Sequence, residues 1–295
     1  MDVQLDAFLI SIFRLCLWLV MLVVIFVPLE RLFAVHEQKI FRKGIATDLI
    51  YYFVSSLLPA LALSAPIGLV AWAVHRAVPS SFLVITASLP LWVQAIFGLI
   101  AAEIGYYWGH RLSHEIPVLW RFHAIHHSAE EVDFLVNTRA HPVDLVFGRF
   151  CALVPIYILG LANPVHVSGS LVPIIVTLIT TTWGFFIHAN IRWRFGPLEW
   201  LISTPAFHHW HHTLSGPINR NYASTLPWLD RMFGTHYLPK QWPTAYGIED
   251  KMPDSLKDQL LYPLRPDVLP MAETSVASVQ ANVVESKGNM PGESL

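Results

Sequence analysis

Long stretches of this sequence contain no charged side chain, and this feature limits the fold more than any other. Residues 49–75, 77–102 and 150–191 contain no Asp, Glu, Lys or Arg. A helix needs about 20 apolar residues to cross the hydrocarbon core of a bilayer, so each stretch is long enough to span one. The alternation of apolar and polar residues that marks membrane β-strands is absent. We therefore predict an all-α, polytopic membrane bundle.

The predicted membrane segments are 7–29, 49–75, 79–107 and a helical hairpin over 146–187. The first has acidic residues before it and charged Glu30-Arg31 after it, unlike a secretory signal peptide. The hairpin is expected to turn at Leu161–Pro164, because Asn163-Pro164 interrupts the apolar run. We interpret residues 1–265 as one integral membrane catalytic domain. Residues 266–295 contain no aromatic side chain and are predicted to form a disordered tail.

Basic residues set the predicted orientation. They follow the first span, the third span and the hairpin, and the span count puts all three groups on one side of the membrane. The residues are Arg31, Lys39, Arg42 and Lys43, then Arg111, Arg121, Arg139 and Arg149, then Arg192, Arg194, Arg220 and Arg231. The positive-inside rule makes that side cytoplasmic. The net charge of −2 gives no reason to expect nucleic acid as a partner.

Histidine is unusually frequent, with 15 residues, and most of these lie in three clusters. The clusters are His110 with His114, His123 with His126 and His127, and His208 with His211 and His212; His188 lies alone before the last. Residues three and four apart share a helical face, so each cluster is expected to present its imidazoles together. Thr204 and Pro205 are predicted to begin the helix of the last cluster. His209 falls about 100° away from His208 on that helix and is left out of the ligand set.

The number of histidines predicts two metal ions. One ion rarely takes more than about six ligands, whereas the three clusters and His188 supply nine imidazoles. Imidazole binds zinc, copper, iron and nickel, but a set this large with open positions favours a redox metal that binds dioxygen. Glu103 and Glu115 are candidates for catalytic roles close to the ligands. Asp133, Asp144 and Asp230 lie nearby, although most acids in such loops are solvated.

Two other classes of protein remain as alternatives. A membrane zinc hydrolase would use Glu115, beside His114, as its base, but the order HExxH is missing. A metal transporter or sensor would place ligands inside the spans, near the bilayer midplane. Residues 49–74 and 77–102 contain no histidine, which argues against a transporter.

The order and spacing of the clusters resemble the fatty acid hydroxylase/sterol desaturase superfamily of integral membrane enzymes. The resemblance covers residues 95–237. Its supporting motifs are Tyr106-Tyr107-Trp108, Leu119-Trp120-Arg121-Phe122-His123, Arg139-Ala140-His141-Pro142, Asn221-Tyr222 and Asp230-Arg231-Met232-Phe233-Gly234-Thr235.

The resemblance implies a membrane-bound oxidoreductase with two iron ions (Fe2+/Fe3+), in which dioxygen serves to hydroxylate or desaturate a lipid. The lipid, of sterol, fatty acyl or alkyl-ether type, would enter from the bilayer. Electrons would come from a separate donor of the cytochrome b5 or ferredoxin type. The resemblance carries over to the eight clustered histidines and to His188, and it leaves His141 open as a site residue or a structural histidine. The site is expected at the cytoplasmic surface.

Overall fold

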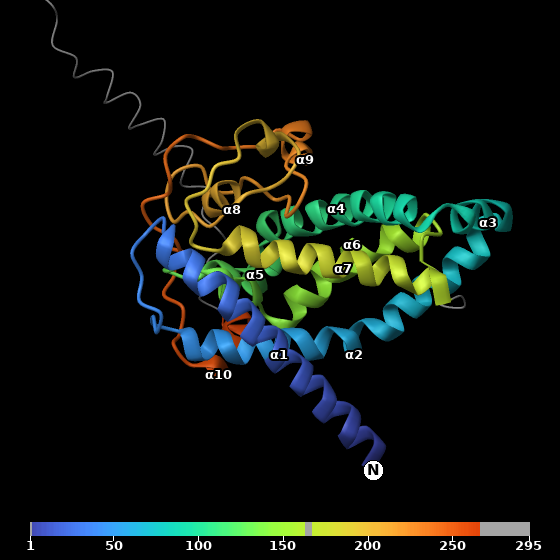
Figure 1. Ribbon diagram of the computed structural model, residues 1–295, viewed down its shortest axis with the longest axis horizontal. Coiled ribbons are helices and arrows are strands. Elements are labelled where there is room, and N and C mark those ends of the chain that lie inside the picture. Colours follow the sequence, from blue (N-terminus) through green and yellow to red (C-terminus); the bar gives the residue numbers. More distant parts are fainter. Residues whose placement is uncertain (1, 163–166, 266–295) are drawn as a thin grey trace, which may run out of the picture.

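The chain folds into a bundle of helices in the computed structural model, which describes residues 2–162 and 167–265 (Figure 1). Within those residues the only β-type pairing is the isolated bridge between Thr213 and Tyr246. The helices are α1 (Asp2–Leu32), α2 (Ile45–Ala77), α3 (Ser80–Ser88), α4 (Leu91–Glu115), α5 (Pro117–His127), η1 (Phe134–Thr138), α6 (Pro142–Ile158), α7 (Val167–His188), η2 (Gly196–Trp200), α8 (Pro205–His211), α9 (Trp228–Met232), α10 (Leu256–Leu261) and η3 (Tyr262–Leu264). The predicted all-α class is confirmed.

Three described helices are long and apolar enough to cross a membrane: Leu5–Leu32, Ile45–Ala77 and Leu171–His188. The N-terminal end of α1 leaves the bundle (Figure 1), and along its length the helix exposes large apolar side chains such as Phe13 and Val24, both 67% exposed. A surface of this kind is stable against lipid tails and unstable in water. The protein is therefore a multi-pass membrane protein, as predicted.

The predicted span 79–107 is divided into two helices in the structure. Helices α3 and α4 meet at an angle of 116°, and together they count as a fourth span or as a re-entrant segment. The cause is Leu89-Pro90 at the junction, because proline has no N–H for the helix and disfavours helical geometry at the residue before it. Helix α4 also continues to Glu115, so His110 and His114 lie on the helix itself.

The predicted hairpin corresponds to α6 and α7. Its break at Asn163-Pro164 lies outside the described residues, as does the predicted tail 266–295. Helix α6 packs against both α4 and α2, while α7 packs against α4 and η1. The predicted segment therefore holds two helices that both pack against α4, the helix that carries His110 and His114.

Small residues let α4 and α6 approach closely. A Cβ atom added at Gly105 would lie 2.0 Å from the carbonyl oxygen of Cys151, and one at Gly109 would lie 2.8 Å from its Cβ. Two glycines four residues apart form the small-xxx-small pattern that brings membrane helices into backbone contact. This contact fixes the height of α4, which carries two of the clustered histidines, against α6.

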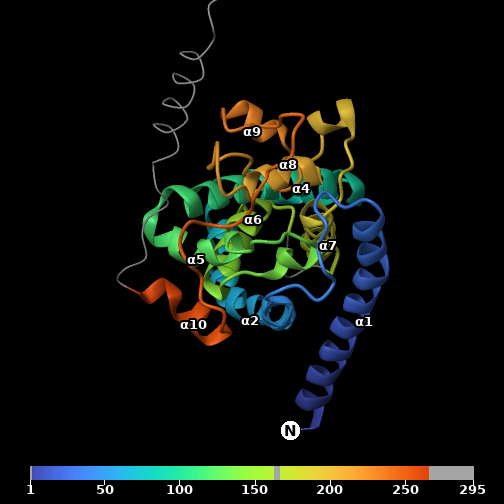
Figure 2. The same ribbon diagram turned by 90° about the vertical axis from the view of Figure 1, so that its left-hand side faces the viewer.

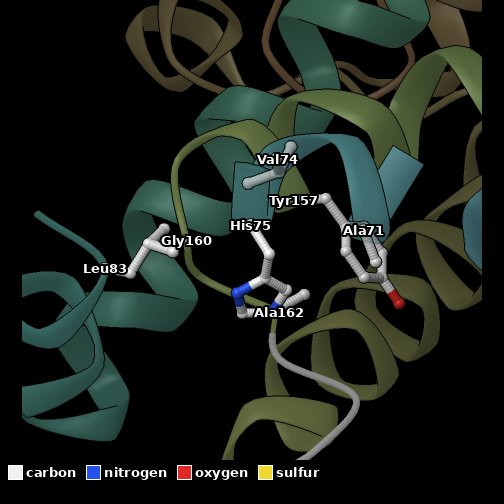
Figure 3. Close-up of a pocket in the computed structure, with 7 residues that line it drawn as sticks. All are labelled: Ala71, Val74, His75, Leu83, Tyr157, Gly160 and Ala162. Atoms are coloured by element: carbon white, nitrogen blue, oxygen red, sulfur yellow. The ribbon is translucent and has the colours of Figure 1, made fainter. Parts of the chain in front are cut away.

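A small pocket lies at the α3 end of the bundle, lined by Ala71, Val74, His75, Leu83, Tyr157, Gly160 and Ala162 (Figure 3). His75 is the only potential metal ligand among these lining residues. The pocket is therefore not a second metal site.

Candidate metal centre

The nine predicted histidines meet at the opposite end of the bundle, where the C-terminal ends of α4, α5 and α7 lie beneath α8 (Figure 2). They form two groups in which the ligand nitrogens lie within 4.8 Å of one another. The first group is His110, His114, His123, His127 and His211, and the second is His126, His188, His208 and His212. None of the nine is more than 8% exposed. Sequence segments 100 residues apart thus build one buried centre.

Helical spacing decides how the clusters divide between the two groups. His123 and His127 are four residues apart and share the first group, while His126 joins the second. On α8 and its C-cap, His208 and His212 share the second group, and His211 joins the first. Residues four apart are nearest neighbours on one face, whereas the third histidine lies off that line. Helices α5 and α8 therefore each contribute to both groups, which the expectation of one patch per cluster did not foresee.

The helix of the last cluster begins as predicted. Thr204 is its N-cap and accepts a hydrogen bond from the N–H of Phe207, and Pro205 occupies the first turn. A cap satisfies a backbone donor that the helix leaves free. This fixes the start of a helix that is only seven residues long, carries His208 and His211, and has His212 as its C-cap.

One four-residue segment, 219–222, orients three imidazoles of the first group. The Nδ1 atoms of His114, His211 and His110 lie 3.2, 2.8 and 2.6 Å from the side-chain oxygen of Asn219, the carbonyl of Arg220 and the carbonyl of Tyr222, respectively. Asn219 and Asn221 have φ values of 61° and 60°, a left-handed conformation that asparagine tolerates better than most residues. The sequence pattern Asn221-Tyr222 therefore marks a backbone turn that holds the ligands.

The segment 219–222 is itself anchored by buried acids. The carboxylate of Asp230 accepts hydrogen bonds from the N–H groups of Tyr222 and Ala223 at 2.7 and 2.9 Å. Glu103 accepts hydrogen bonds from the Ser224 hydroxyl and from the N–H groups of Thr225 and Leu226. Glu103 belongs to neither histidine group, so the structure gives it a role in fixing a loop.

Asp144 completes the first group. Its carboxylate lies 3.0 Å from Nδ1 of His123, at the start of α6. Carboxylates in this position hold a metal-binding imidazole in one tautomer and increase its basicity. The sequence made Asp144 a weaker candidate than Glu103 for such a role, because most acids in loops of this kind are solvated. The sequence did contain a sign of this contact: Asp144 lies in the first turn of the helix that begins after His141, and that turn faces the second cluster.

Backbone carbonyls orient two imidazoles of the second group, those of His126 and His188. Nδ1 of His126 lies 3.1 Å from the carbonyl of Arg139, and Nδ1 of His188 lies 2.7 Å from that of Gly184. Arg139 is held by Asp48 at 3.4 Å, and Arg42 binds Asp48 at 2.8 Å and Asp133 at 2.6 Å. These buried ion pairs connect the start of α2 to the backbone that receives His126.

The protonation of the imidazoles shows that the residues fit a metal. Nδ1 donates its hydrogen to each oxygen acceptor described above, so a neutral ring directs the lone pair of Nε2 inward. Burial lowers the pKa of His126 to about 3 and holds the pKa values of His127, His208, His211 and His212 well below the usual range. These five rings are therefore neutral.

Inward lone pairs then face one another at short range. Nε2 of His110 lies 3.1 Å from Nε2 of His123, and Nε2 of His188 lies 3.3 Å from that of His126. The Nε2 atoms of His114 and His211 are buried without any hydrogen-bond partner. Facing lone pairs repel, and a cation between them removes both the repulsion and the unmet need for a partner. Both groups therefore fit one metal ion each.

Three other residues considered in the sequence lie outside both groups. Glu115 is exposed and pairs with Arg111 at 2.7 Å. His141 caps α6 by accepting a hydrogen bond from Val143, and its Nε2 lies 3.3 Å from the carbonyl of Leu260. His209 is buried against the Tyr246 hydroxyl at 2.7 Å and the Ala189 carbonyl at 3.1 Å. The exclusion of His209 thus agrees with its contacts.

Substitution of Asp144 tests its role in orienting His123. We expect Asp144→Ala to weaken metal binding about 10- to 100-fold, because the imidazole loses its only carboxylate partner. Asp144→Asn keeps an oxygen acceptor and should lose less. Titration of the metal-loaded protein with a chelator measures both. Equal affinity in Asp144→Ala and the wild type would show that the contact does not orient a ligand.

Residues 95–235 match the sequence model of the family described as fatty acid hydroxylase, and all nine histidines lie inside the match. No solved structure matches the chain.

Individual relatives share this region. The chain is 37% identical to the ornithine lipid hydroxylase OlsE of Rhizobium tropici over 59% of this chain and 51% of that protein. It is 30% identical to the alkylglycerol monooxygenase of Homo sapiens over 53% of this chain and 33% of that protein. It is 28% identical to methylsterol monooxygenase 2-2 of Arabidopsis thaliana over 65% and 68% of the two chains. The chain thus spans about half or less of the first two relatives.

Proposed function

Because this chain belongs to the fatty acid hydroxylase family, we propose that it is a membrane-bound di-iron oxidoreductase that uses dioxygen to hydroxylate or desaturate a lipid. The observation that carries the proposal is the convergence of nine buried imidazoles in two groups at one end of a membrane bundle. Similar relatives named as a lipid hydroxylase and as monooxygenases support the type of reaction.

Each group would hold one iron ion through its Nε2 atoms. When bound, the two ions supply the activation of dioxygen and the oxidising power for an unactivated C–H bond, which no side chain can provide. The residues of this chain orient the ligands that have Nδ1 contacts, and the buried position of all nine, none more than 8% exposed, excludes water from the centre. In hydroxylation, one oxygen atom enters the lipid and the other leaves as water, with electrons from a separate donor of the cytochrome b5 or ferredoxin type.

A zinc hydrolase has less support than this proposal. Its candidate base, Glu115, is exposed and neutralised by Arg111. Among the described residues, the one carboxylate that contacts a ligand histidine is Asp144, and it is already bonded to Nδ1 of His123. A general base must reach the proton that it abstracts, and neither acid is free to do so.

The proposal is tested by metal analysis and product analysis on the same preparation. Protein purified in detergent and loaded with iron should contain two iron ions per chain. With a reductant, a ferredoxin and its reductase, and bilayer lipids under 18O2, it should form an oxidised lipid: a hydroxylated product that carries 18O or a desaturated product. One metal ion per chain, or oxidation by the zinc-loaded protein, would contradict the proposal.

The position of the centre on the cytoplasmic side is a second part of the proposal, supported by the basic residues near it. Cysteines at Glu130 and Ser215, both exposed, can be introduced on a background that lacks Cys16 and Cys151. We expect both to react with a membrane-impermeant thiol reagent only when the cytoplasmic side is accessible. Reaction of both cysteines from the outside of intact cells would show that the centre faces the outside, while still placing all the histidines on one side of the membrane.

A further inference from the structure

A group of large apolar side chains lies on the outside of the protein, where α9 lies over α4 (Figure 1). They come from η2 and the residue after it, from the end of α9, and from α4. We call them the η2–α9 surface, and each is between 37% and 61% exposed: Trp108, Leu198, Trp200, Leu201, Met232 and Phe233. Single exposed apolar residues are common, whereas a contiguous group marks a contact with a protein or a membrane.

Two contacts make this surface continuous. The guanidinium carbon of Arg231 lies 3.7 Å from the centre of the Trp200 ring, which connects α9 to η2. The ring of Phe233 lies 4.9 Å from the ring of Trp108, which connects the end of α9 to α4. The other members of the surface lie within two residues of these in the sequence. Three separate segments of the chain therefore build one apolar area.

In both outer segments the acid turns inward and the apolar residues turn outward. The carboxylate of Glu199 is largely buried, accepts a backbone hydrogen bond at 3.1 Å and lies 3.7 Å from Arg194. Asp230 is fully buried, whereas Leu201 and Met232 are exposed. Segments that face water usually have the opposite arrangement, with acids outside and large apolar residues inside. The outward side of these segments therefore suits an apolar medium.

The surface continues a face of α4 that already contacts lipid. Phe97, Ile104 and Trp108 are exposed, and their spacings of seven and four residues place them on one face of the helix. Helices α3 and α4 form a fourth span or a re-entrant segment, and in either case this exposed face contacts lipid. Trp108 is the last of the three and contacts Phe233. The lipid-facing side of the bundle thus continues onto α9 and η2.

The composition of the surface fits the headgroup region of a bilayer. Tryptophan is enriched at membrane–water interfaces because its ring has an apolar body and a polar N–H. Arginine can keep its stem in apolar surroundings while its guanidinium reaches the lipid phosphates. The two are combined here, since Arg231 stacks on Trp200 and Arg111 lies 5.4 Å from the ring of Trp108. A protein partner would not account for the continuation of the surface along α4.

We propose that the η2–α9 surface rests in the headgroup region of the bilayer that the helices cross, on the side of the metal centre. This contact holds the first histidine group near the level of the headgroups. The ring of Phe233 lies 5.2 Å from that of Tyr107, Tyr107 lies 6.0 Å from Tyr222, and Tyr222 lies 5.1 Å from His114. The contact needs neither metal nor turnover, so it goes beyond the proposed function and does not depend on it.

The depth of the surface can be measured with fluorescent labels and quenching lipids. Leu201→Cys and Met232→Cys are each made on a cysteine-free background, labelled with bimane and placed in phosphatidylcholine nanodiscs. The nanodiscs contain a lipid with a nitroxide either near the headgroup or near the end of the acyl chain. Leu17→Cys, in the middle of α1, is the lipid-facing control, and the exposed position Glu130→Cys is the water-facing control.

We expect the headgroup nitroxide to quench the labels at Leu201 and Met232 at least about twice as strongly as the label at Glu130. The physical reason is that an interfacial apolar face is buried about 5–10 Å into the boundary between headgroups and acyl chains. The acyl-chain nitroxide should quench the label at Leu17 more strongly than the labels at Leu201 and Met232.

A charged substitution within the surface should weaken the contact. Trp200→Glu is expected to lower the quenching of the label at Met232, because Trp200 contacts Arg231 beside that position. Phe41→Glu is the matched control, since Phe41 is an exposed aromatic residue outside the surface, and it should leave this quenching unchanged. Elution volume and metal capacity establish that each variant is folded.

The outcomes separate this inference from its rivals and from the proposed function. Quenching at Leu201 and Met232 no stronger than at Glu130 would overturn the membrane contact. So would shielding of these labels from a water-soluble quencher that needs two chains in one nanodisc or an added electron-donor protein, because a second copy or that partner would then cover the surface. Strong headgroup quenching in a chain that oxidises no lipid would support the contact and reject the oxidase function.

Discussion

His126→Ala and His211→Ala are each expected to lower the metal content from two ions per chain to one and to reduce lipid oxidation about 100-fold or more. His126 belongs to the second histidine group and His211 to the first, so each variant removes one ligand from a different ion. Loss of a residue that orients a metal ligand lowers metal affinity or activity about 10- to 100-fold, and loss of a ligand itself should have a larger effect. Elemental analysis and product formation measure the two effects.

His209→Ala is the matched control for this pair. His209 lies on the same helix as His211 and is fully buried, but it bonds to Tyr246 and Ala189 and faces neither group. The variant should keep two ions while losing some stability from the unpaired Tyr246 hydroxyl. All three variants should still insert into membranes, because the spans need no metal. Equal metal loss in His209→Ala and His211→Ala would contradict the division of this helix into a ligand face and a structural face.

The histidines of the two groups could be predicted from sequence because local spacing places the members of each cluster on one helix. His110 with His114, and His208 with His212, follow the i, i+4 rule, and the total of nine imidazoles predicts two ions. Which histidine belongs to which ion was not predictable in the same way. His126 and His211 each join the group that the other two histidines of their cluster do not join, because α5 and α8 each face both groups, and that placement depends on tertiary packing.

The residues that orient the ligands were hidden for a different reason. The carbonyls of Arg139, Arg220 and Tyr222 receive Nδ1 hydrogens, and a carbonyl leaves no trace in the identity of its side chain. Asp144 is separated from His123 by 21 residues and a change of helix. Glu103 was expected to act near the metals because acids are rare at membrane depth. The donors of its hydrogen bonds, Ser224 and Thr225, lie on a loop that only the folded chain places beside Glu103.

Gly105→Ala is expected to cost about 3 kcal/mol or more in the free energy of unfolding and to remove the metal ion of the first histidine group. The added Cβ would lie 2.0 Å from the carbonyl oxygen of Cys151 and 2.9 Å from the ring of Pro155, so α4 and α6 must separate. Because α4 carries His110 and His114 and α6 carries Asp144, their separation moves the ligands of the first group. Gly68→Ala on α2 should be neutral or slightly stabilising, since nothing lies within 4 Å of the added atom.

The two glycines of α4 should differ in how they can be rescued, and this difference tests the cause of the damage. At Gly109 the nearest atoms are the Cβ and Sγ of Cys151, at 2.8 and 2.9 Å, so Cys151→Gly should restore much of the stability lost in Gly109→Ala. At Gly105 the nearest atom belongs to the backbone, which no side-chain substitution removes. Thermal unfolding in detergent and metal content measure both pairs. Rescue of Gly105→Ala by Cys151→Gly, or a Gly105→Ala variant with unchanged stability and metal content, would mean that the two helices do not touch through their backbones.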